Sequence, residues 1–289
     1  MIKGKPSYPF DTVALAIAFS PRLEQLIAET KRLTGIFHAR AIFIHAGKKT
    51  SDKQRQLTTL LSNYGFNDTN SKIVWELGNP VDAILAVCKR EVVDLLIIGA
   101  LEKENVLKYY MGSISREISR KAKCCVLMLT RPSVQPRPFR KIIANGHEHA
   151  KTLNTLNTAL YFAKQDDASE ITVVDEVDIP ALSMSMAEDS TEPEGNQIRN
   201  EFISDEHSRM TGLLNQISPG SINIHHKIIS GRSGHTISKF AAQQAADLLV
   251  VNSPDHSLSI FDRIFTHDLE YMLADMPCNM LIVHTRNVE

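Results

Sequence analysis

Residues suited to binding a phosphate group lie between positions 98 and 115. Ile98 and Gly99 end an apolar run, while Gly112, Ser113 and Ser115 open a segment with helical spacing of apolar residues. Glycine permits a sharp turn, and the start of a helix presents backbone N–H groups and the positive end of the helix dipole. Beside the carboxyl end of a strand, such groups form a cradle for an anion. We expect Ser113 to be the N-cap of this helix.

Patterns typical of catalysis or of metal binding are missing from the sequence. The chain has no GxSxG nucleophile elbow, no Walker motif and no pair of carboxylates at a recognisable spacing. Histidines near predicted strand ends and a predicted helix start come without a Cys pair or an HExxH pattern, namely His147, His149, His225, His226 and His235. The sequence therefore predicts a protein that is not an enzyme and has no metal site.

The cradle must be positioned by a sheet, and strands alternate with helices along the first part of the chain. Asn79 and Pro80 give the strongest helix start, as cap and first helical residue, and Gly35 is expected to end the first helix. Trp75 is expected in the core. Strands are predicted at 10–18, 41–46, 73–77, 94–99 and 126–129, with helices from Ser20, over 51–63, from Pro80 and from Ser113. This order predicts a doubly wound, five-stranded parallel sheet.

The chain then repeats itself. Asp247-Leu-Leu-Val-Val-Asn252 parallels Asp94-Leu-Leu-Ile-Ile-Gly99, and Phe139 stands in the repeat where Phe10 stands in the first copy. We therefore predict two α/β domains, 1–132 and 139–289, joined by a proline-rich linker at 133–138. The second copy carries extra length around 176–200, which lacks clear periodicity and is expected to be a mobile surface excursion.

Composition excludes several classes of protein. The chain has 289 residues, 43% of them apolar, and its 32 basic and 33 acidic residues give a net charge of -1. Such a balance favours neither a nucleic-acid partner nor a membrane surface. No apolar stretch reaches the length of a membrane helix, so we expect a cytoplasmic protein. The four cysteines lie in apolar patterns without disulfide or metal spacing, and we interpret them as buried thiols.

The sequence resembles a tandem universal stress protein, with two family domains over nearly its whole length. In that family a strand-ending Gly is followed by two residues, a second Gly, nine residues, and then Gly with Ser or Thr. Here Gly99 is followed by Ala100 and Leu101, then by Glu102 at the second Gly position, and Lys103 to Met111 lead to Gly112-Ser113. The resemblance implies the Rossmann-related HUP fold, with the two domains pairing through their last strands.

The resemblance also implies a nucleotide site in the first copy. Family members that bind ATP place a glycine-lined loop under the phosphates, and the matching residues are Ile98, Gly99, Gly112, Ser113 and Ser115. An Asp near the adenine is replaced by Ala18, and Glu102 adds a negative charge to the loop. The second copy departs further, with His147, Asn252 and Phe265-Thr266 at the corresponding positions. We expect that second site to be lost.

Three functions follow as expectations. The first is a non-catalytic cytoplasmic protein of the stress response that acts through a ligand or an unknown protein partner, with segment 100–111 shifting between ligand-bound and free forms. The second is a regulator that binds ATP or another adenine nucleotide in the first domain. The third is a nucleotide-free scaffold that forms a homodimer, for which the 176–200 segment offers a contact surface.

Overall fold

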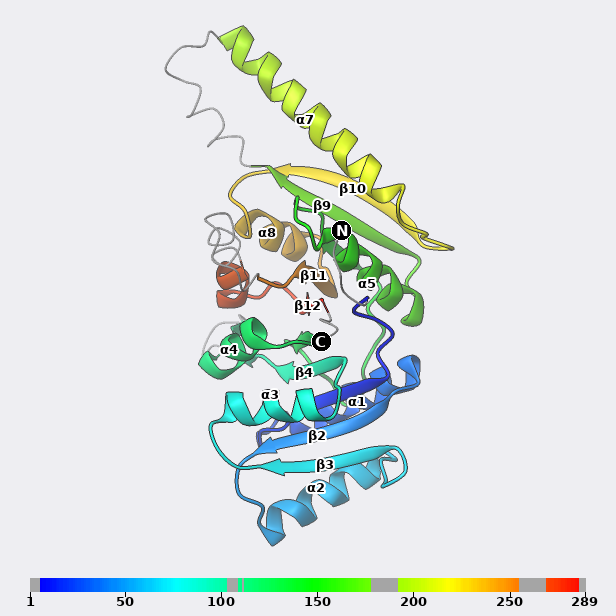
Figure 1. Ribbon diagram of the computed structural model, residues 1–289, viewed down its shortest axis with the longest axis vertical. Coiled ribbons are helices and arrows are strands. Elements are labelled where there is room, and N and C mark those ends of the chain that lie inside the picture. Colours follow the sequence, from blue (N-terminus) through cyan, green and yellow to red (C-terminus); the bar gives the residue numbers. More distant parts are fainter. Residues whose placement is uncertain (1–5, 103–108, 111, 178–191, 255–268, 286–289) are drawn as a thin grey trace.

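The fold is one continuous ten-stranded sheet, seen in a computed structural model that describes residues 6–102, 109–110, 112–177, 192–254 and 269–285 (Figure 1). The first half of the chain contains β1 (Thr12–Ala16), α1 (Leu23–Phe37), β2 (Arg40–Ala46), α2 (Ser51–Asn63), β3 (Ser71–Glu76), α3 (Pro80–Arg90), β4 (Leu95–Gly99), β5 (Leu101–Glu102), β6 (Tyr109–Tyr110), α4 (Ser113–Lys121) and β7 (Cys125–Leu129). The second half contains β8 (Ile142–Asn145), α5 (Thr152–Gln165), β9 (Glu170–Val177), α7 (Glu192–Leu214), β10 (Asn223–Ser230), α8 (His235–Gln243), β11 (Leu248–Asn252) and β12 (Asn279–Val283).

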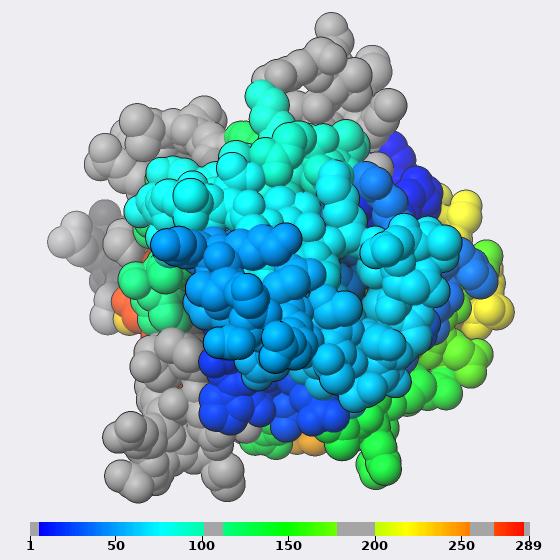
Figure 2. Space-filling model, turned by 90° about the horizontal axis from the view of Figure 1, so that it is seen from below, coloured from blue at the N-terminus to red at the C-terminus, as the bar shows by residue number. Residues whose placement is uncertain are grey.

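Each half contributes five parallel strands, as the sequence predicts. The strand order is β10-β9-β8-β11-β12-β7-β4-β1-β2-β3, and only the central pair, β12 with β7, is antiparallel. The expected pairing of the two halves through their last strands is thus confirmed. Figure 2 looks along the sheet onto the end of the first half, where α2 and β3 lie. The antiparallel centre places the carboxyl edge of one half beside the amino edge of the other.

Helices cover both faces of the sheet and bury a separate apolar core on each. One core contains side chains of α1, α2, α5 and α7, and the other contains side chains of α3, α4, α8 and a helical turn over 269–274. The apolar runs of the central strands explain this arrangement, because a strand buried on both faces needs a helix on each. All four cysteines are buried thiols outside any disulfide, as expected.

The repeated Asp of the two DLL motifs has a structural role at the amino edge of each half. Asp94 Oδ2 accepts hydrogen bonds from the amides of residues 11 and 12, each at 2.8 Å. Asp247 Oδ2 accepts from the amides of residues 140 and 141, at 2.9 and 2.8 Å. A carboxylate that accepts two amide bonds fixes the start of β1 or β8 against the neighbouring strand.

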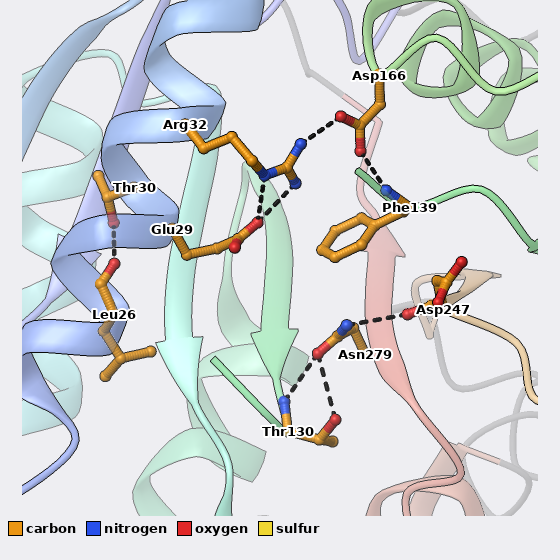
Figure 3. Close-up of polar contacts among 9 residues, drawn as sticks. All are labelled: Leu26, Glu29, Thr30, Arg32, Thr130, Phe139, Asp166, Asp247 and Asn279. Carbon is orange, nitrogen blue, oxygen red and sulfur yellow. Dashed lines mark hydrogen bonds and ion pairs between the residues drawn. The ribbon is translucent and has the colours of Figure 1, made fainter. Parts of the chain in front are cut away.

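Two different clusters join the halves on the α1 and α5 side. In the first, Tyr161 of α5 lies against Phe10 and Phe37, with ring centroids 5.4 and 5.8 Å apart. In the second, Arg32 of α1 lies over the Phe139 ring at 4.9 Å and forms an ion pair with Asp166 (Figure 3). Arg32 and Tyr161 stand at equivalent positions of the repeat, 129 residues apart. The seam is therefore aromatic at one end and ionic at the other.

Three local predictions are wrong. Helix α1 continues past Gly35 and ends at Phe37, where His38 takes a left-handed φ of 54°. The N-cap of α4 is Gly112, and Ser113 is the first helical residue. Part of the predicted excursion at 176–200 is the beginning of α7, a helix of 23 residues where the first half has the 13 residues of α2. Residues 178–191 lie outside the described residues.

Candidate functional site

Strand β4 carries the first two predicted cradle residues. Its Ile98 and Gly99 lie in register with Met128 and Leu129 of β7. Ile98 is buried, and Gly99 is half-buried against α1. A Cβ built on Gly99 would lie 3.1 Å from Leu26 Cδ1. This contact is tighter than ordinary van der Waals packing, so a side chain at position 99 would crowd Leu26 of α1. The close approach of α1 therefore explains the glycine here without any ligand.

The start of α4 carries the other three predicted residues. Gly112 has extended backbone angles and no side-chain cap, and the first intrahelical bond is donated by Arg116 N to Gly112 O at 3.0 Å. Ser113 is exposed and Ser115 is half-buried. The amides of residues 113–115 precede that first bond, as the leading amides of any helix do. Ile118 of α4 belongs to the same buried cluster as Ile98, which fixes the helix beside β4.

Arg22, which the sequence reasoning missed, lies at the ends of β4 and β7. Its guanidinium donates one hydrogen bond to Ala100 O at 2.6 Å and another to Thr130 O. Lys151 has the equivalent place in the second half, where Nζ donates to the carbonyl of Ser253 at 3.2 Å. Each half therefore holds a cation over the end of its fourth strand. The signal was present in the repeat, since both residues are basic and 129 positions apart.

Aromatic side chains fill the space next to Ala18. His45 lies edge-on to Phe19 and Trp75, with ring centroids 5.0 and 5.1 Å apart, and Phe19 and Trp75 are stacked at 6.2 Å. Trp75 Nε1 donates to Gln54 Oε1 at 2.8 Å. The Trp75 side chain, which the sequence places in the core, is half-buried and packs against the apolar core from its edge. His45 is 9% exposed, and its Nε2 has no hydrogen-bond partner among the described residues.

Charged side chains fill the corresponding space of the second half. Asp175 takes the place of His45, is 1% exposed and shares Arg209 with Glu206. Burial raises the pKa of Asp175 to about 8, and its hydrogen bond to Glu206 adds to the shift while Arg209 opposes it. Burial alone would raise the pKa of Glu206, but hydrogen bonds from Asp175 and Arg209 hold this pKa below its ordinary value.

The other predicted residues that the structure describes lie at the carboxyl ends of β8 and β11 in the second half. His147 follows β8, and Asn252 accepts a hydrogen bond from Thr155 and donates one to Thr152 at 3.1 Å. Phe265 and Thr266 lie outside the described residues. No group of three or more His, Cys, Asp or Glu side chains able to hold a metal occurs in the described part of the chain. Within the same residues, no helix has the length and apolar character needed to cross a bilayer.

Comparison with known proteins identifies the family. The model of the universal stress protein family matches residues 46–130 and again 139–284. The chain belongs to the universal stress protein family. No curated protein matches it. The double match confirms the resemblance to a tandem universal stress protein.

Solved structures of similar length share the fold. A universal stress protein of Archaeoglobus fulgidus DSM 4304 is 14% identical, with a TM-score of 0.66 over 97% of this chain and 100% of that chain. A protein of unknown function from Pseudomonas aeruginosa PAO1 is also 14% identical, with a TM-score of 0.65 over 96% of this chain and 93% of that chain. A universal stress protein solved in complex with cAMP matches only part of this chain, at 20% identity over 42% of this chain and 96% of that chain, with a TM-score of 0.35.

Proposed function

We propose that this universal stress protein is a non-catalytic, cytoplasmic protein of the stress response that acts by binding. The binding surface is the carboxyl edge of its first half, and the ligand is recognised there through a phosphate group. Segment 100–111, which follows β4 and precedes α4 in the sequence, shifts between the free and the bound forms, which changes the surface offered to a protein partner.

The position of Arg22 is the observation that carries this proposal. Its guanidinium bonds to the carbonyls of Ala100 and Thr130 and so holds a permanent positive charge at the strand ends. The first turn of α4, after Gly112, adds backbone amides and the positive end of a helix dipole. A fixed cation and a helix start favour an anion at the same edge.

An adenine nucleotide is the first ligand to test, because the residues that the family resemblance ties to ATP are present as Ile98, Gly99, Gly112, Ser113 and Ser115. The purine would meet the aromatic cluster of Phe19, His45 and Trp75 beside Ala18. His45 Nε2 can accept a hydrogen bond there, since Nδ1 lies 3.1 Å from the carbonyl of Ile17 and therefore carries the proton.

The test combines native mass spectrometry of the purified protein with titration by ATP and AMP in the presence of magnesium. We expect binding by the wild type and loss of binding in Gly112→Val, because the added side chain occupies the start of the cradle. Gly212→Val is the matched control, since Gly212 lies in α7 with no neighbouring atom within 4 Å of a built Cβ. Hydrogen exchange should show protection of segment 100–111 only with bound ligand. Equal binding by both variants would refute the proposal.

A nucleotide-free dimeric scaffold is the second candidate. One observation favours it: both halves fill the space at the ends of their first two strands with their own side chains, His45 in one half and Asp175 in the other. A scaffold predicts that the protein purifies empty and ignores nucleotide, yet has the native mass of a dimer. The sheet edges β3 and β10 are the strands on which such a second copy could pair.

A further inference from the structure

A groove between the two halves has a cavity volume of about 1110 Å³. It is lined by α1 and the end of β7 on the first half, by the linker, and by α8 and segment 271–279 on the second half. Its apolar lining includes Phe139, Ala242, Ala246, Met276 and Pro277. None of the five predicted cradle residues lines it. The volume is slightly above the roughly 300–1,000 Å³ of pockets that hold small organic ligands.

The inner end of the groove carries excess negative charge. Glu29 and Asp166 both form ion pairs with Arg32, so two carboxylates share one guanidinium. Glu29 is only 3% exposed, and both bonds from Arg32 go to Oε1, which leaves Oε2 without a partner in the described part of the chain. Figure 3 shows this carboxyl group pointing from α1 toward Phe139. Burial raises the pKa of Glu29, although Arg32 opposes the shift.

Two hydroxyl groups of the groove lining can also bind a ligand. Thr130 Oγ1 donates to Asn279 Oδ1 at 3.2 Å, so its lone pairs can accept a further bond (Figure 3). On the second half, Ser238 Oγ is buried and has no partner among the described residues. A buried polar atom without a partner costs free energy that a ligand can recover.

The mouth of the groove has the opposite sign of charge. Exposed basic side chains line it at Arg131, Arg137 and Lys239. The acidic side chains of the lining other than Glu29 are Asp247, whose Oδ2 is held by two backbone amides, and the exposed Asp275. A ligand that fits both ends carries a cation at one end and an anion at the other.

We propose that this groove binds a small zwitterion with a primary ammonium group, an amino acid or a short peptide. The ammonium donates to Glu29 Oε2 and to Thr130, the apolar body lies along Phe139 and Met276, and the acidic end faces Arg137 and Lys239. Bound ammonium balances the second carboxylate that Arg32 alone leaves uncompensated. The proposal is independent of nucleotide binding, since the groove and the carboxyl-edge cradle use different side chains.

The test is isothermal titration calorimetry of the full chain with four probes: L-leucine, the tripeptide Leu-Gly-Gly, N-acetyl-leucine and isoamylamine. Binding of L-leucine identifies an amino-acid site, and binding of the tripeptide alone identifies a peptide site. N-acetyl-leucine should not bind, because it lacks the ammonium. Isoamylamine should bind at least several-fold more weakly than L-leucine, because it lacks the acidic end.

Glu29→Gln should weaken binding about tenfold or more, the usual loss when a charged hydrogen-bond partner is neutralised. Thermal unfolding without ligand should occur at the same or a higher temperature in this variant, because the amide still accepts from Arg32 and the excess charge is gone. Glu24→Gln is the matched control, on the exposed face of the same helix and outside the groove. Lys239→Ala should weaken binding of L-leucine but not of isoamylamine. Failure of both zwitterions to bind the wild type, or equal binding by Glu29→Gln, would overturn the proposal.

Discussion

Replacement of Asp175 by Asn should remove a pH dependence from the stability of the second half. Asp175 is 1% exposed, and its Oδ2 accepts from Arg209, whose Nε donates to Glu206 Oε1 at 2.7 Å. Because the pKa of Asp175 is raised to about 8, this carboxyl holds a proton at neutral pH and donates it to Glu206. An Asn amide can make both contacts, since its N–H donates to Glu206 and its oxygen accepts from Arg209.

The sign of the effect follows from proton binding in the two states. Folded Asp175 keeps its proton up to about pH 8, whereas the unfolded chain loses it near the ordinary value of 3.8. Between these values the folded state binds more protons, so the free energy of unfolding falls as the pH rises. A lone group would lose about 4 kcal/mol between pH 5 and pH 8, at about 1.4 kcal/mol per pH unit. Proton sharing with Glu206 reduces this, and we expect about 2 kcal/mol.

Urea denaturation followed by circular dichroism at several values between pH 5 and pH 9 measures this effect. The free energy of unfolding of the wild type should fall relative to that of Asp175→Asn as the pH rises. A constant difference over this range, or a variant several kcal/mol less stable than the wild type at pH 5, would contradict a protonated Asp175 in the folded state.

Three further predictions concern the packing of the sheet and its helices. Asn79→Ala removes the cap that Val81 N reaches at 2.9 Å and should lower the free energy of unfolding by about 1 kcal/mol, measured by urea titration; an unchanged midpoint would contradict the capping role. Phe10→Ala empties a fully buried site at the seam and should cost about 3–5 kcal/mol, whereas exposed Val134→Ala should change thermal unfolding little. Burial raises the pKa of Cys278 to about 12, so iodoacetamide at pH 8 should leave this thiol unmodified until urea unfolds the chain. Rapid labelling of Cys278 in the native protein, detected by mass spectrometry, would contradict its burial.

The fold could be predicted because its signals are local and repeated. The apolar runs of β4 and β11, the Asn79-Pro80 helix start and the duplicated DLL motif each point to the same doubly wound sheet. Helix ends were harder to predict. Gly35 was expected to stop α1, but a helix interior tolerates glycine when the next turn buries Phe37. The start of α7 was missed because a mostly polar helix has no clear apolar stripe.

Only part of the candidate site could be predicted from the sequence, for a different reason. Gly99, Gly112 and Ser113 stand in a pattern along the chain, so spacing alone brings them to one edge. Arg22 and His45 act through contacts with residues distant in sequence, such as the bond from Arg22 to Ala100. Such contacts depend on how far α1 and β2 extend before the chain turns. The spacing of residues along the sequence does not predict these lengths.

Because the seam has different residues on its two sides, the two halves pair like the unlike subunits of a heterodimer within one chain. Two copies of the first half would face Arg32 with Phe37 and leave two guanidinium groups without Asp166, while two copies of the second half would bury two Asp166 carboxylates beside tyrosine. Removing one partner of a buried ion pair costs about 3–5 kcal/mol, so each half selects the other over itself. Because both halves stand in one chain, neither has to be complementary to a copy of itself. A substitution at the seam therefore alters one position of the interface, whereas in a dimer of identical subunits it would alter two.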